Sequence, residues 1–519
     1  MNATLRPAPP PPAPLAVLAD GLGLLGDAQG RVAVTGVTLD SRAVRPGWLY
    51  VALPGTRTHG AAFAGAAVAS GAAAILTDHA GLALLDQPEV PVLLADDARH
   101  AAAVMAARFY GEPARALTML GVTGTNGKTT TVALLQAGLA ADGRLAGTIG
   151  TIGFRLGAEE LRTSRTTVTT PEAPDLQALL AVMQQRGAQA VAVEVSSHAL
   201  ALSRVDGIEF DVAAFLNLGR DHLDFHRDLD DYFEAKAALF EPGRAAASVV
   251  WVDDPKGREI AHRVATHGKS RLITVGSTPE AEYVLTGYEA LAPLGGRATL
   301  TRAGESLPLE LTLPGEYNMI DAAVAFAMLE AVGVSAEAAL AGLREAQVPG
   351  RMQRVDLGAD APLVVVDFAH TPQAVGAALE SLAGHGRIVT VLGCGGDRDP
   401  DKRPEMGAAA ARGSDLTLIT DDNPRSEDPA VIRAQTIAGA RSALRAGADL
   451  LEVAGRRAAI ETALRGAGAG TVVAILGKGH ERGQILADRT VDFDDVEEAT
   501  QAWRRLTEEG ATDAPPHDD

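Results

Sequence analysis

Residues 121–130 constrain this chain more than any other stretch. They read Gly-Val-Thr-Gly-Thr-Asn-Gly-Lys-Thr-Thr, between an apolar, strand-like segment at residues 116–122 and a segment at residues 129–141 whose apolar side chains recur at helical spacing. A glycine-rich loop between a strand and a helix can point several backbone N–H groups at a phosphate, and the helix dipole favours the negative charge. Lys128 can then reach the terminal phosphates, and the hydroxyl of Thr129 can bind Mg2+.

The sequence therefore predicts a phosphate-binding loop. Its members are Gly121, Val122, Thr123, Gly124, Thr125, Asn126, Gly127, Lys128, Thr129 and Thr130. Val122 stands where the usual pattern has a small residue, and Gly121 comes one position before the usual glycine. A tight glycine turn that binds no phosphate is the alternative.

Composition excludes several classes of protein. The single cysteine, Cys394, rules out a disulfide framework and a cysteine-rich metal site, and it fits a reducing compartment. A formal net charge of −20 argues against a nucleic-acid partner, which needs a basic face. No apolar run approaches the roughly 20 residues of a membrane span. We expect a cytoplasmic, monomeric protein that does not insert into a membrane.

The lysines are few. The chain has six lysines against forty arginines, so each lysine is of interest, because ammonium and guanidinium groups are not interchangeable. Four of the six lie in the motifs discussed here: Lys128, Lys236, Lys402 and Lys478.

Length and hydrophobic pattern predict an α/β protein of three domains. We expect a small α/β domain at residues 15–115, a central domain with a mainly parallel sheet of the P-loop ATPase type at 116–348, and a Rossmann-like domain at 349–508. Residues 1–14 are rich in proline and residues 509–519 are acidic, and we expect both to be disordered tails.

Apolar runs locate the main strands. The strands expected in the central domain are residues 188–195, 212–216, 248–252 and 272–275, with three further short strands within 284–313. Those expected in the third domain are residues 363–367, 388–392, 416–420 and 472–476. Helices are expected at residues 316–331 and 336–346.

Three polar residues of the central domain are candidates for chemistry. Glu194 closes an apolar strand, and His222 lies in a loop, residues 217–226, that follows the next strand. In open α/β sheets functional groups gather at these carboxyl ends, where a carboxylate can bind Mg2+. Lys236 shares a helix face with apolar side chains. The alternatives are a solvated strand end for Glu194, polar surface for the loop, and a snorkelling side chain for Lys236.

Three polar loops follow strands of the third domain, at residues 393–404, 421–425 and 477–481. Together they supply guanidinium, amide and carboxylate groups, a set that suits a zwitterionic amino acid with a further carboxylate. Arginine would bind the carboxylate in two-pronged fashion, and Glu481 or Asp422 would bind the ammonium group. Each loop alone could be ordinary turn chemistry.

These motifs, in this order, resemble the Mur ligase family, and within it the branch that makes the UDP-N-acetylmuramoyl tripeptide. The matching stretches beyond the loop at residues 123–130 are 194–198, 221–226, 234–236, 351–352, 367–372, 396–398, 422–425 and 477–481. The resemblance covers all of the chain except its two tails. In three places the chain departs from the pattern: Asp321 and Val168 stand where relatives carry asparagine, and Leu202 where they carry glutamine.

The resemblance implies site residues of several kinds. Those near ATP, besides the loop, are Asn318, Arg351 and Asp367; those at the metal and the reacting phosphate are Lys128, Thr129, Glu194, His222 and Lys236, the last as a carbamate (N6-carboxylysine). The residues implied for the UDP-sugar are Leu39, Ser41, Thr169, Thr170, Ser196 and Arg204. Those implied for the amino acid are Arg403, Asp422, Asn423, Pro424, Arg425, Gly477 and Glu481.

The implied reaction is an ATP- and Mg2+-dependent amide ligation in peptidoglycan precursor synthesis. The D-glutamate carboxylate of UDP-MurNAc-L-Ala-D-Glu takes the γ-phosphoryl group, and the amine of an incoming diamino acid displaces phosphate. The Asp-Asn-Pro-Arg sequence at residues 422–425 favours meso-diaminopimelate; L-lysine or L-ornithine is the alternative. A sibling ligase that adds D-Ala-D-Ala or glutamate is disfavoured by residues 194–198 and 422–425. A nucleotide-binding switch or scaffold without ligase activity is the alternative from another class.

Overall fold

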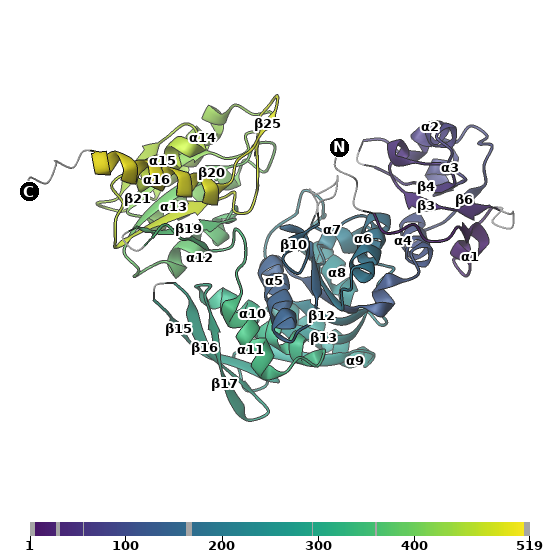
Figure 1. The fold of residues 1–519 in the computed structure, drawn as a ribbon, viewed down its shortest axis with the longest axis horizontal. Helices are drawn as coiled ribbons and strands as arrows, with labels where there is room; N and C mark the ends of the chain where they lie inside the picture. Colours follow the sequence, from purple (N-terminus) through teal and green to yellow (C-terminus); the bar gives the residue numbers. More distant parts are fainter. Residues whose placement is uncertain are drawn as a thin grey trace, which may run out of the picture. The chain divides into compact units, whose positions relative to one another are not determined.

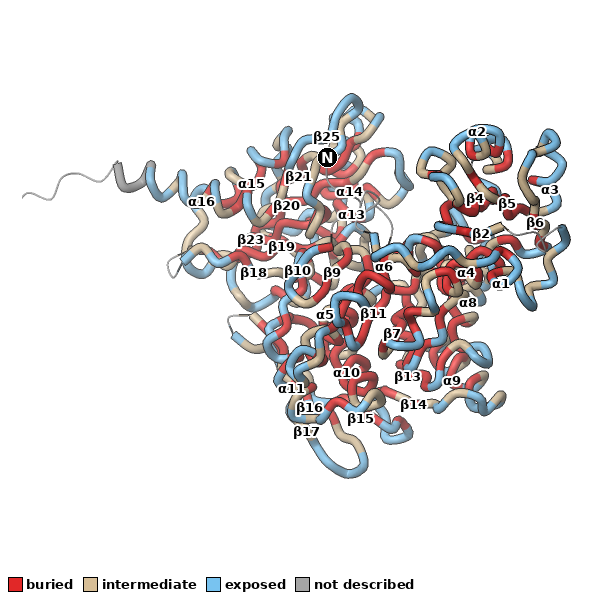
Figure 2. Tube along the Cα trace, turned by 45° about the vertical axis from the view of Figure 1, so that its right-hand side comes forward, coloured by how far each residue is buried: buried red, intermediate tan, exposed pale blue. Residues whose placement is uncertain are grey.

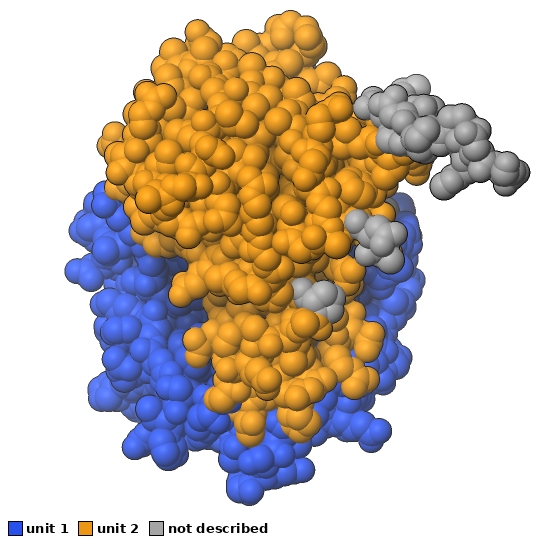
Figure 3. Space-filling model, turned by 90° about the vertical axis from the view of Figure 1, so that its left-hand side faces the viewer, with its two compact units in different colours: residues 1–286, 300–307, 320–343 blue, residues 287–299, 308–319, 344–519 orange. Residues whose placement is uncertain are grey.

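The computed structural model describes residues 6–26, 32–55, 57–161, 169–292, 294–358 and 361–512. The chain divides into two compact units (Figure 3). The first holds residues 1–286, 300–307 and 320–343, and the second holds 287–299, 308–319 and 344–519. Figure 1 labels their helices and strands.

The first unit begins with a four-stranded parallel sheet. Its strands, in spatial order, are β3 (Gly36–Thr38), β4 (Trp48–Ala52), β5 (Ala74–Thr77) and β6 (Val92–Leu94). The helices that accompany it are α1 (Leu15–Ala19), α2 (Ala64–Ala69), α3 (His79–Leu82) and α4 (Ala98–Phe109), with 3-10 turns η1 (Ser41–Ala43), η2 (Gly60–Phe63) and η3 (Pro113–Ala116). All five residues of β4 are buried, so apolar side chains cover both faces of this sheet.

The main sheet of the first unit is mostly parallel, as the sequence predicts. The first eight strands in spatial order are β10 (Glu159–Glu160), β9 (Gly153–Leu156), β8 (Ala146–Gly150), β11 (Ala190–Glu194), β7 (Thr118–Thr123), β12 (Phe210–Phe215), β13 (Ala245–Trp251) and β14 (Arg271–Gly276). The sheet continues past β14 with β15 (Tyr283–Ala290), β16 (Gly296–Arg302) and β17 (Glu305–Leu311). The five strands from β8 to β13 pair in parallel, and β9 and β10 are antiparallel additions at one edge. Helix α5 (Lys128–Ala141) packs on β7, β8 and β11, and these three strands are almost entirely buried (Figure 2).

The remaining helices of this region are α6 (Ala173–Gln185), α7 (Ser197–Ala201), α8 (Leu229–Ala237), η4 (Ala238–Phe240) and α9 (Pro255–His267), besides α5 (Lys128–Ala141). Five elements are divided between the two units: β15 (Tyr283–Ala290), β16 (Gly296–Arg302), β17 (Glu305–Leu311), α10 (Glu316–Ala331) and α11 (Ala336–Glu345).

The second unit is built on a six-stranded sheet. Its spatial order is β18 (Gln353–Val355), β19 (Leu363–Asp367), β23 (Thr471–Leu476), β20 (Arg387–Cys394), β21 (Leu416–Asp421) and β22 (Asp449–Glu452); only β18 is antiparallel. Its other elements are α12 (Pro372–Ser381), α13 (Lys402–Gly413), α14 (Pro429–Ser442), α15 (Arg456–Leu464), α16 (Asp495–Thr512), β24 (Gln484–Ile485) and β25 (Thr490–Val491). Helices α15 and α16 share a buried core with alternate residues of the strands.

The predicted fold class is confirmed, and two details of the tails are wrong. Ala13 and Pro14 were expected in a loose tail, but they form strand β1, which pairs with β2 (Ala33–Val34) through antiparallel backbone contacts. Helix α16 continues to Thr512, beyond the expected start of the acidic tail at residue 509. Among the described residues, no helix is both long and apolar enough to span a membrane.

Helices α13 and α14 approach so closely that a glycine is required between them. A Cβ at Gly439, on α14, would overlap the carbonyl oxygen of Pro404 on α13. We expect Gly439→Ala to lower the free energy of unfolding of the second unit by about 1–3 kcal/mol, the usual cost of overpacking. Gly376→Ala, on helix α12 with open space around its Cβ, is the matched control and should be neutral or stabilising by up to about 1 kcal/mol. Urea unfolding of both variants measures the difference; equal stabilities would contradict the packing described here.

Candidate active site

The strand register brings three loops to one edge of the main sheet. Glu194, the last residue of β11, pairs with Val122 of β7, and Phe215, the last residue of β12, pairs with Thr123. Because parallel strands end at the same edge, the segments after β7, β11 and β12 begin side by side. These are the segments that carry the predicted phosphate-binding loop, Glu194 and His222.

The phosphate-binding loop turns between β7 and α5 and depends on Gly127. This residue is the N-cap of α5 with φ +88°, a conformation that favours glycine. A Cβ there would also collide with the carboxylate of Asp321. Gly121 and Val122 lie inside β7, with Gly121 against the ring of Phe210. The residues free to bend around a phosphate are therefore those from Gly124 onward.

Asn217, at the start of the loop after β12, holds the phosphate-binding loop in place. Its carbonyl oxygen accepts from the N–H of Thr125 at 3.0 Å, and its side-chain oxygen accepts from the N–H of Asn126 at 2.9 Å. The Asn217 amide returns a bond to the carbonyl of Asn126 at 3.2 Å. The hydroxyl of Thr125 lies 3.1 Å from the hydroxyl of Tyr232 on α8. The loop shape is thus fixed by both neighbouring segments.

Two lysines meet at one carbonyl oxygen. Nζ of Lys128 donates to the carbonyl of Gly124 at 2.8 Å and to that of Thr125 at 2.9 Å, while Nζ of Lys236 donates to the same Gly124 carbonyl at 2.8 Å. Lys236 is only 1% exposed and lies over the ring of Tyr232. Burial holds the pKa of Lys236 well below its usual range, and the Lys128 charge lowers it further against the opposing effect of Asp221. The Lys236 amine therefore loses its proton more easily than that of an exposed, snorkelling lysine.

Glu194 is a buried carboxylate, not a solvated strand end. One oxygen accepts from the backbone N–H of Thr151 and the other from the Thr151 hydroxyl, both at 2.9 Å. Glu194 is 1% exposed, and a Cβ at Gly150 would occupy the same space as its carboxylate. The side chain is therefore held in one orientation at the edge of the sheet where the phosphate-binding loop begins.

Two histidines of the loop after β12, His222 and His226, pack against His198 of α7. His222 has a left-handed backbone (φ +54°), and its ring meets that of His198 edge to face at 4.9 Å. Burial lowers the pKa of His222; Asp221 opposes this, while Lys128 and Lys236 reinforce it. The pKa of His198 falls to about 4, first through burial and then through His222, His226 and Arg204. His226 is bound on both sides, with Nε2 at 2.9 Å from the Ser197 hydroxyl and Nδ1 at 3.3 Å from Asp231.

Three of the four predicted magnesium donors fit the metal in chemistry, and the fourth, His222, would supply a nitrogen atom. The hydroxyl of Thr129, the carboxylate of Glu194 and a carbamate on Lys236 would be oxygen donors, which Mg2+ prefers. The buried hydroxyl of Thr123 has no hydrogen-bond partner in the protein, so it is available to a bound ligand at this edge of the sheet. No group of three or more His, Cys, Asp or Glu side chains among the described residues is placed to hold a metal. Thr129 and Lys236 are not among these four residue types, so this finding does not bear on a metal site that uses them.

The residues predicted for the UDP-sugar fall in two places of the first unit. Leu39 and Ser41 flank Asp40, the N-cap of η1, at the end of β3. Thr170, Ser196 and Arg204 form a hydrogen-bonded group at the end of β11, and the hydroxyl of Thr169 lies 3.0 Å from that of Thr151. In this group the Thr170 hydroxyl donates to the carbonyl of Glu194 at 2.6 Å, and Arg204 donates to the carbonyl of Thr170 at 2.9 Å. Val168 lies outside the described residues.

In the second unit, the residues predicted near ATP have strong structural contacts. Both carboxylate oxygens of Asp367 accept backbone N–H groups, from Met352 at 2.6 Å and from Ala369 at 2.8 Å. Burial raises the pKa of Asp367, against the opposing charge of Arg351. The amide of Asn318 donates to the carbonyl of Pro314 at 2.6 Å. Asp367 therefore fixes the backbone turn that presents Arg351.

The two arginines predicted to bind an amino acid differ in how far they are engaged. Arg403 is 1% exposed, and its Nη atoms donate to both oxygens of Glu427 at 2.9 and 2.7 Å and to Gln435 at 2.8 Å. Arg425 is half-buried with φ +52°, and its Nη1 donates to the carbonyl of Gly396 at 2.6 Å. Arg425 thus keeps N–H groups for a ligand carboxylate, whereas Arg403 would have to exchange its bonds to Glu427.

The loops after β21 and β23 are joined by hydrogen bonds. Nδ2 of Asn423 donates to Glu481 at 2.8 Å, and Nζ of Lys478 lies 3.0 Å from Oδ1 of Asn423. Burial raises the pKa of Glu481; the charge of Asp422 adds to this rise, and that of Lys478 opposes it. The structure therefore brings together Asp422, Asn423 and Glu481, as the sequence predicts. Gly477, with φ +109°, is the first residue of the loop after β23.

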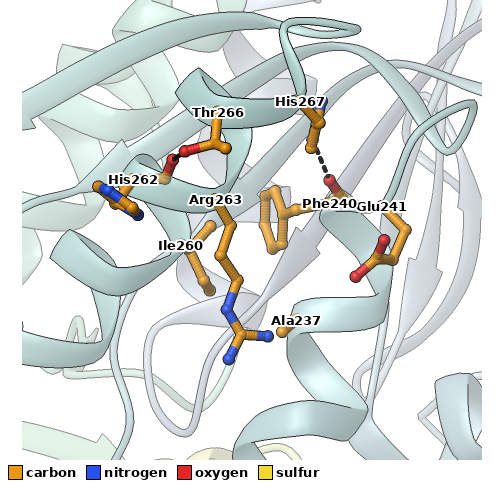
Figure 4. A pocket seen from close by; sticks show the side chains of 8 residues that line it. All are labelled: Ala237, Phe240, Glu241, Ile260, His262, Arg263, Thr266 and His267. Atoms are coloured by element: carbon orange, nitrogen blue, oxygen red, sulfur yellow. Dashed lines mark hydrogen bonds between the residues drawn. The ribbon is translucent and has the colours of Figure 1, made fainter.

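A pocket in the first unit lies apart from these groups (Figure 4). It is lined by Ala237, Phe240, Glu241, Ile260, His262, Arg263, Thr266 and His267. Nε2 of His267 bonds the carbonyl of Phe240 at 3.0 Å, and Arg263 is paired with Glu234 and Glu259. None of the predicted site residues lines it.

Comparison with known proteins agrees with this architecture. Three family models match the chain in order: "Mur ligase family, catalytic domain" at residues 33–110, "Mur ligase middle domain" at 122–329 and "Mur ligase, glutamate ligase domain" at 350–479. A Streptomyces coelicolor protein named UDP-N-acetylmuramoyl-L-alanyl-D-glutamate--2,6-diaminopimelate ligase is 44% identical over 511 residues, 96% of this chain and 99% of its own length. The chain belongs to the Mur ligase family.

Two further matches extend the comparison. A Leifsonia xyli protein named UDP-N-acetylmuramyl-tripeptide synthetase is 43% identical over 96% of this chain and 98% of its own length. A solved structure titled as a UDP-N-acetylmuramoyl-L-alanyl-D-glutamate--2,6-diaminopimelate ligase superposes with a TM-score of 0.70 at 30% identity, covering 96% of this chain and 99% of that one.

Several residues that shape the site were not predicted. Thr151 binds both oxygens of Glu194, and Asn217 ties down the phosphate-binding loop. Asp321 was noted only as a departure from a pattern, yet its carboxylate lies against Gly127. Each acts across a long sequence separation. Only the polar character of Asn217, directly after an apolar strand, offered a signal.

The lowered pKa of His198 has a consequence for stability. The folded state keeps this ring neutral down to about pH 4, whereas the unfolded chain takes up the proton near the ordinary value of about 6.5. Stability should therefore rise with pH between these values. We expect His198→Phe, which keeps a ring against Phe225, to show a shallower rise. NMR titration identifies the His198 signal by its loss in the variant; titration of that signal near pH 6.5 would contradict the predicted shift.

Proposed function

We propose that this protein ligates meso-diaminopimelate to the D-glutamate carboxylate of UDP-MurNAc-L-Ala-D-Glu, at the expense of ATP, in peptidoglycan precursor synthesis. The observation that carries the proposal is the pair of lysines on the Gly124 carbonyl, at the sheet edge where the buried Glu194 lies. A relative 44% identical over 96% of this chain bears the name of such a ligase. The reaction would serve cell-wall growth, and hence cell shape and division, in the cytoplasm.

ATP would be bound by residues 124–130. The first N–H groups of an α-helix point out of its N-terminal end, so those of α5 can donate to phosphate oxygens, with the helix dipole in support. In this structure Lys128 bonds the loop carbonyls of Gly124 and Thr125, and it would move to the γ-phosphate when ATP binds. Asn318, Arg351 and Asp367 are proposed to meet the adenosine part. Mg2+, held by Thr129, Glu194, His222 and the modified Lys236, would neutralise phosphate charge.

Lys236 would act as a carbamate. A neutral amine is the form that attacks CO2, and burial lowers the pKa of Lys236, which favours that form. The amine nitrogen forms a bond to the carbon of CO2 and loses one proton, which gives an anionic carbamate. That group would place an anion next to Lys128, where the protonated amine of Lys236 would be repelled by the Lys128 charge. A nucleotide-binding scaffold would have no use for such a group.

The chemistry needs two transfers. The D-glutamate carboxylate oxygen attacks the γ-phosphorus, its bond to ADP breaks, and ADP leaves with the electron pair to give an acyl phosphate. The amine then attacks the acyl carbon, loses a proton, and phosphate leaves. The chain supplies charge and position, through Lys128 on the phosphoryl oxygens and through the fixed loops that orient the two reactants. Leu39, Ser41, Thr169, Thr170, Ser196 and Arg204 are proposed to bind the UDP-sugar.

The amino-acid site would be the loops of the second unit. Arg425 has the free guanidinium edge needed to bind the distal carboxylate of diaminopimelate, and Glu481 would take the ammonium group. Asp422, Asn423, Pro424 and Gly477 would complete the site. Arg403 is proposed to support the Gly395 carbonyl and Glu427 instead of reaching the ligand. L-lysine and L-ornithine remain the alternatives, since the Leifsonia xyli relative's name leaves the amino acid open.

The proposal predicts which acceptor supports turnover. Phosphate release from ATP should require both UDP-MurNAc-L-Ala-D-Glu and a diamino acid, with meso-diaminopimelate preferred over L-lysine and L-ornithine. Lys128→Ala should abolish release, because it removes the cation expected at the γ-phosphate. Release without any acceptor would favour a simple nucleotidase, and preference for lysine or ornithine would overturn the proposed role of residues 422–425.

Arg425→Lys tests the carboxylate contact directly. The variant keeps the charge but loses the fork, so KM for meso-diaminopimelate should rise about tenfold or more, the effect of one charge-assisted hydrogen bond. Turnover with L-lysine, which lacks the distal carboxylate, should not change. Arg412→Lys, at an exposed position in the last turn of α13, is the control. Equal KM values for Arg425→Lys and the control would remove Arg425 from the site.

The carbamate can be observed without turnover. Carbon-13 NMR after incubation with labelled bicarbonate should show one carbamate signal that is lost in Lys236→Arg, since a guanidinium does not react with CO2. The variant should also lose ligase activity by about a hundredfold or more, in keeping with the loss of a charge-stabilising group. Lys269→Arg, exposed in the same unit, is the matched control. A wild-type spectrum without the signal, with full activity, would contradict the proposal.

A further inference from the structure

The last lysine of the sequence motifs, Lys478, is fully buried beneath the loops of the second unit. It follows β23 by two positions and has 0% exposure. Nζ donates to Oδ1 of Asn423 at 3.0 Å and to the carbonyl of Gly483 at 2.7 Å. Nζ also lies 3.2 Å from Oδ1 of Asp422, in an ion pair that lacks hydrogen-bond geometry. It lies 3.5 Å from Oε2 of Glu481. A compact ammonium group thus contacts three of the residues assigned above to the amino-acid site.

These contacts determine which way the Asn423 amide faces. Its Oδ1 receives the Lys478 ammonium and, at 3.0 Å, the backbone N–H of Ile485. Both partners can only donate, so the atom between them must be the oxygen. The amide nitrogen then necessarily points to Glu481, 2.8 Å away. One lysine therefore orders a chain from Nζ through Asn423 to the carboxylate of Glu481.

The charges around Lys478 leave one carboxylate unbalanced. Arg456 and Asp495, both 0% exposed, form a two-pronged ion pair at 2.7 and 2.6 Å. Lys478 faces two carboxylates, Asp422 and Glu481, so the cluster holds three negative and two positive groups. Of the three carboxylates, Glu481 is the most exposed, at 36% of its side chain. The net negative charge is therefore presented at the surface of the cluster by Glu481.

We propose that Lys478 is a positioning residue for the amino-acid substrate: it orients Asn423 and Glu481 so that the Glu481 carboxylate receives the ammonium group of the incoming amino acid. This inference rests on the proposed ligase function and adds a residue to its site. Lysine suits the position because its three donors radiate from one small group, whereas a planar guanidinium needs more room. In a chain of forty arginines and six lysines, this position has kept lysine.

Steady-state kinetics of Lys478→Met test the assignment. The variant keeps an unbranched side chain but loses the donors, so the Asn423 amide can turn and Glu481 is no longer held. We expect KM for the amino acid to rise about tenfold or more, with KM for ATP and for UDP-MurNAc-L-Ala-D-Glu unchanged and kcat reduced less than threefold. Lys269→Met, at an exposed position, is the matched control and should leave all three KM values unchanged.

Two readouts separate positioning from general support of the fold. The acidic limb of the pH profile of kcat/KM for the amino acid should move to higher pH in Lys478→Met, because the Lys478 charge lowers the pKa of Glu481 while Asp422 raises it. Asn423→Ala should raise the same KM, and the double variant should be no worse than the worse single variant, since both changes break one chain. A structural role alone would predict additive losses and an unmoved pH profile.

Each outcome decides a different question. If the wild-type protein releases no phosphate with any diamino acid, the proposed function fails. If the wild type is active and Lys478→Met has an unchanged KM for the amino acid, only the role of Lys478 fails. If Lys478→Met does not fold, Asn423→Ala decides: an unchanged KM for the amino acid in that variant would also overturn the inference.

Discussion

Two ammonium groups share the carbonyl oxygen of Gly124, and much of the first unit is arranged to make this possible. Lys128 reaches it from α5 and Lys236 from α8. Burial lowers the pKa of Lys236, and the nearby charge of Lys128 lowers it further. The surrounding contacts, Asn217 to the loop and Thr125 to Tyr232, hold the carbonyl in place. A buried lysine whose pKa is lowered, beside a phosphate-binding loop, is better suited to react than an exposed lysine.

In the second unit, buried charged groups are paired with groups of opposite charge. Its buried groups, Arg456 with Asp495 and Lys478 with Asp422, lie below loops that end in the half-exposed Glu481 and Arg425. Buried ion pairs contribute little net stability, because desolvation offsets their attraction. These ion pairs instead determine orientation, because each holds a polar loop in one arrangement. The two exposed groups, one anionic and one cationic, then match the two ends of an amino acid with a distal carboxylate.

Sequence predicted the strands and helices well because apolar periodicity is local. Helix α10 and strand β19 have the predicted bounds, and the strands that lead to the phosphate-binding loop and to Glu194 differ by only a few residues. Strand β1 was missed, since a two-residue strand has no periodic pattern and exists only through its pairing with β2. The polar residues at strand ends could be assigned to the candidate site for the same reason, because the ends of apolar strands can be located in the sequence.

What sequence could not supply were partners distant in the chain. The Glu194–Thr151 contact, the packing of Asp321 against Gly127 and the bonds from Arg403 to Glu427 all depend on tertiary folding. The last of these changes an interpretation, since Arg403 was assigned to the substrate and is largely occupied by Glu427. Snorkelling was the ordinary expectation for Lys236 from periodicity alone, and its burial shows why that expectation does not hold.

The transfer of oxygen from substrate to phosphate tests the proposed chemistry most directly. The D-glutamate γ-carboxylate of UDP-MurNAc-L-Ala-D-Glu would be labelled with oxygen-18, and the phosphate released from ATP in the presence of meso-diaminopimelate would be analysed by mass spectrometry. Attack of the carboxylate on the γ-phosphorus predicts one labelled oxygen in each phosphate released. Unlabelled phosphate would show that water, not the carboxylate, accepts the phosphoryl group, and it would contradict an acyl phosphate formed beside Lys128 and Lys236.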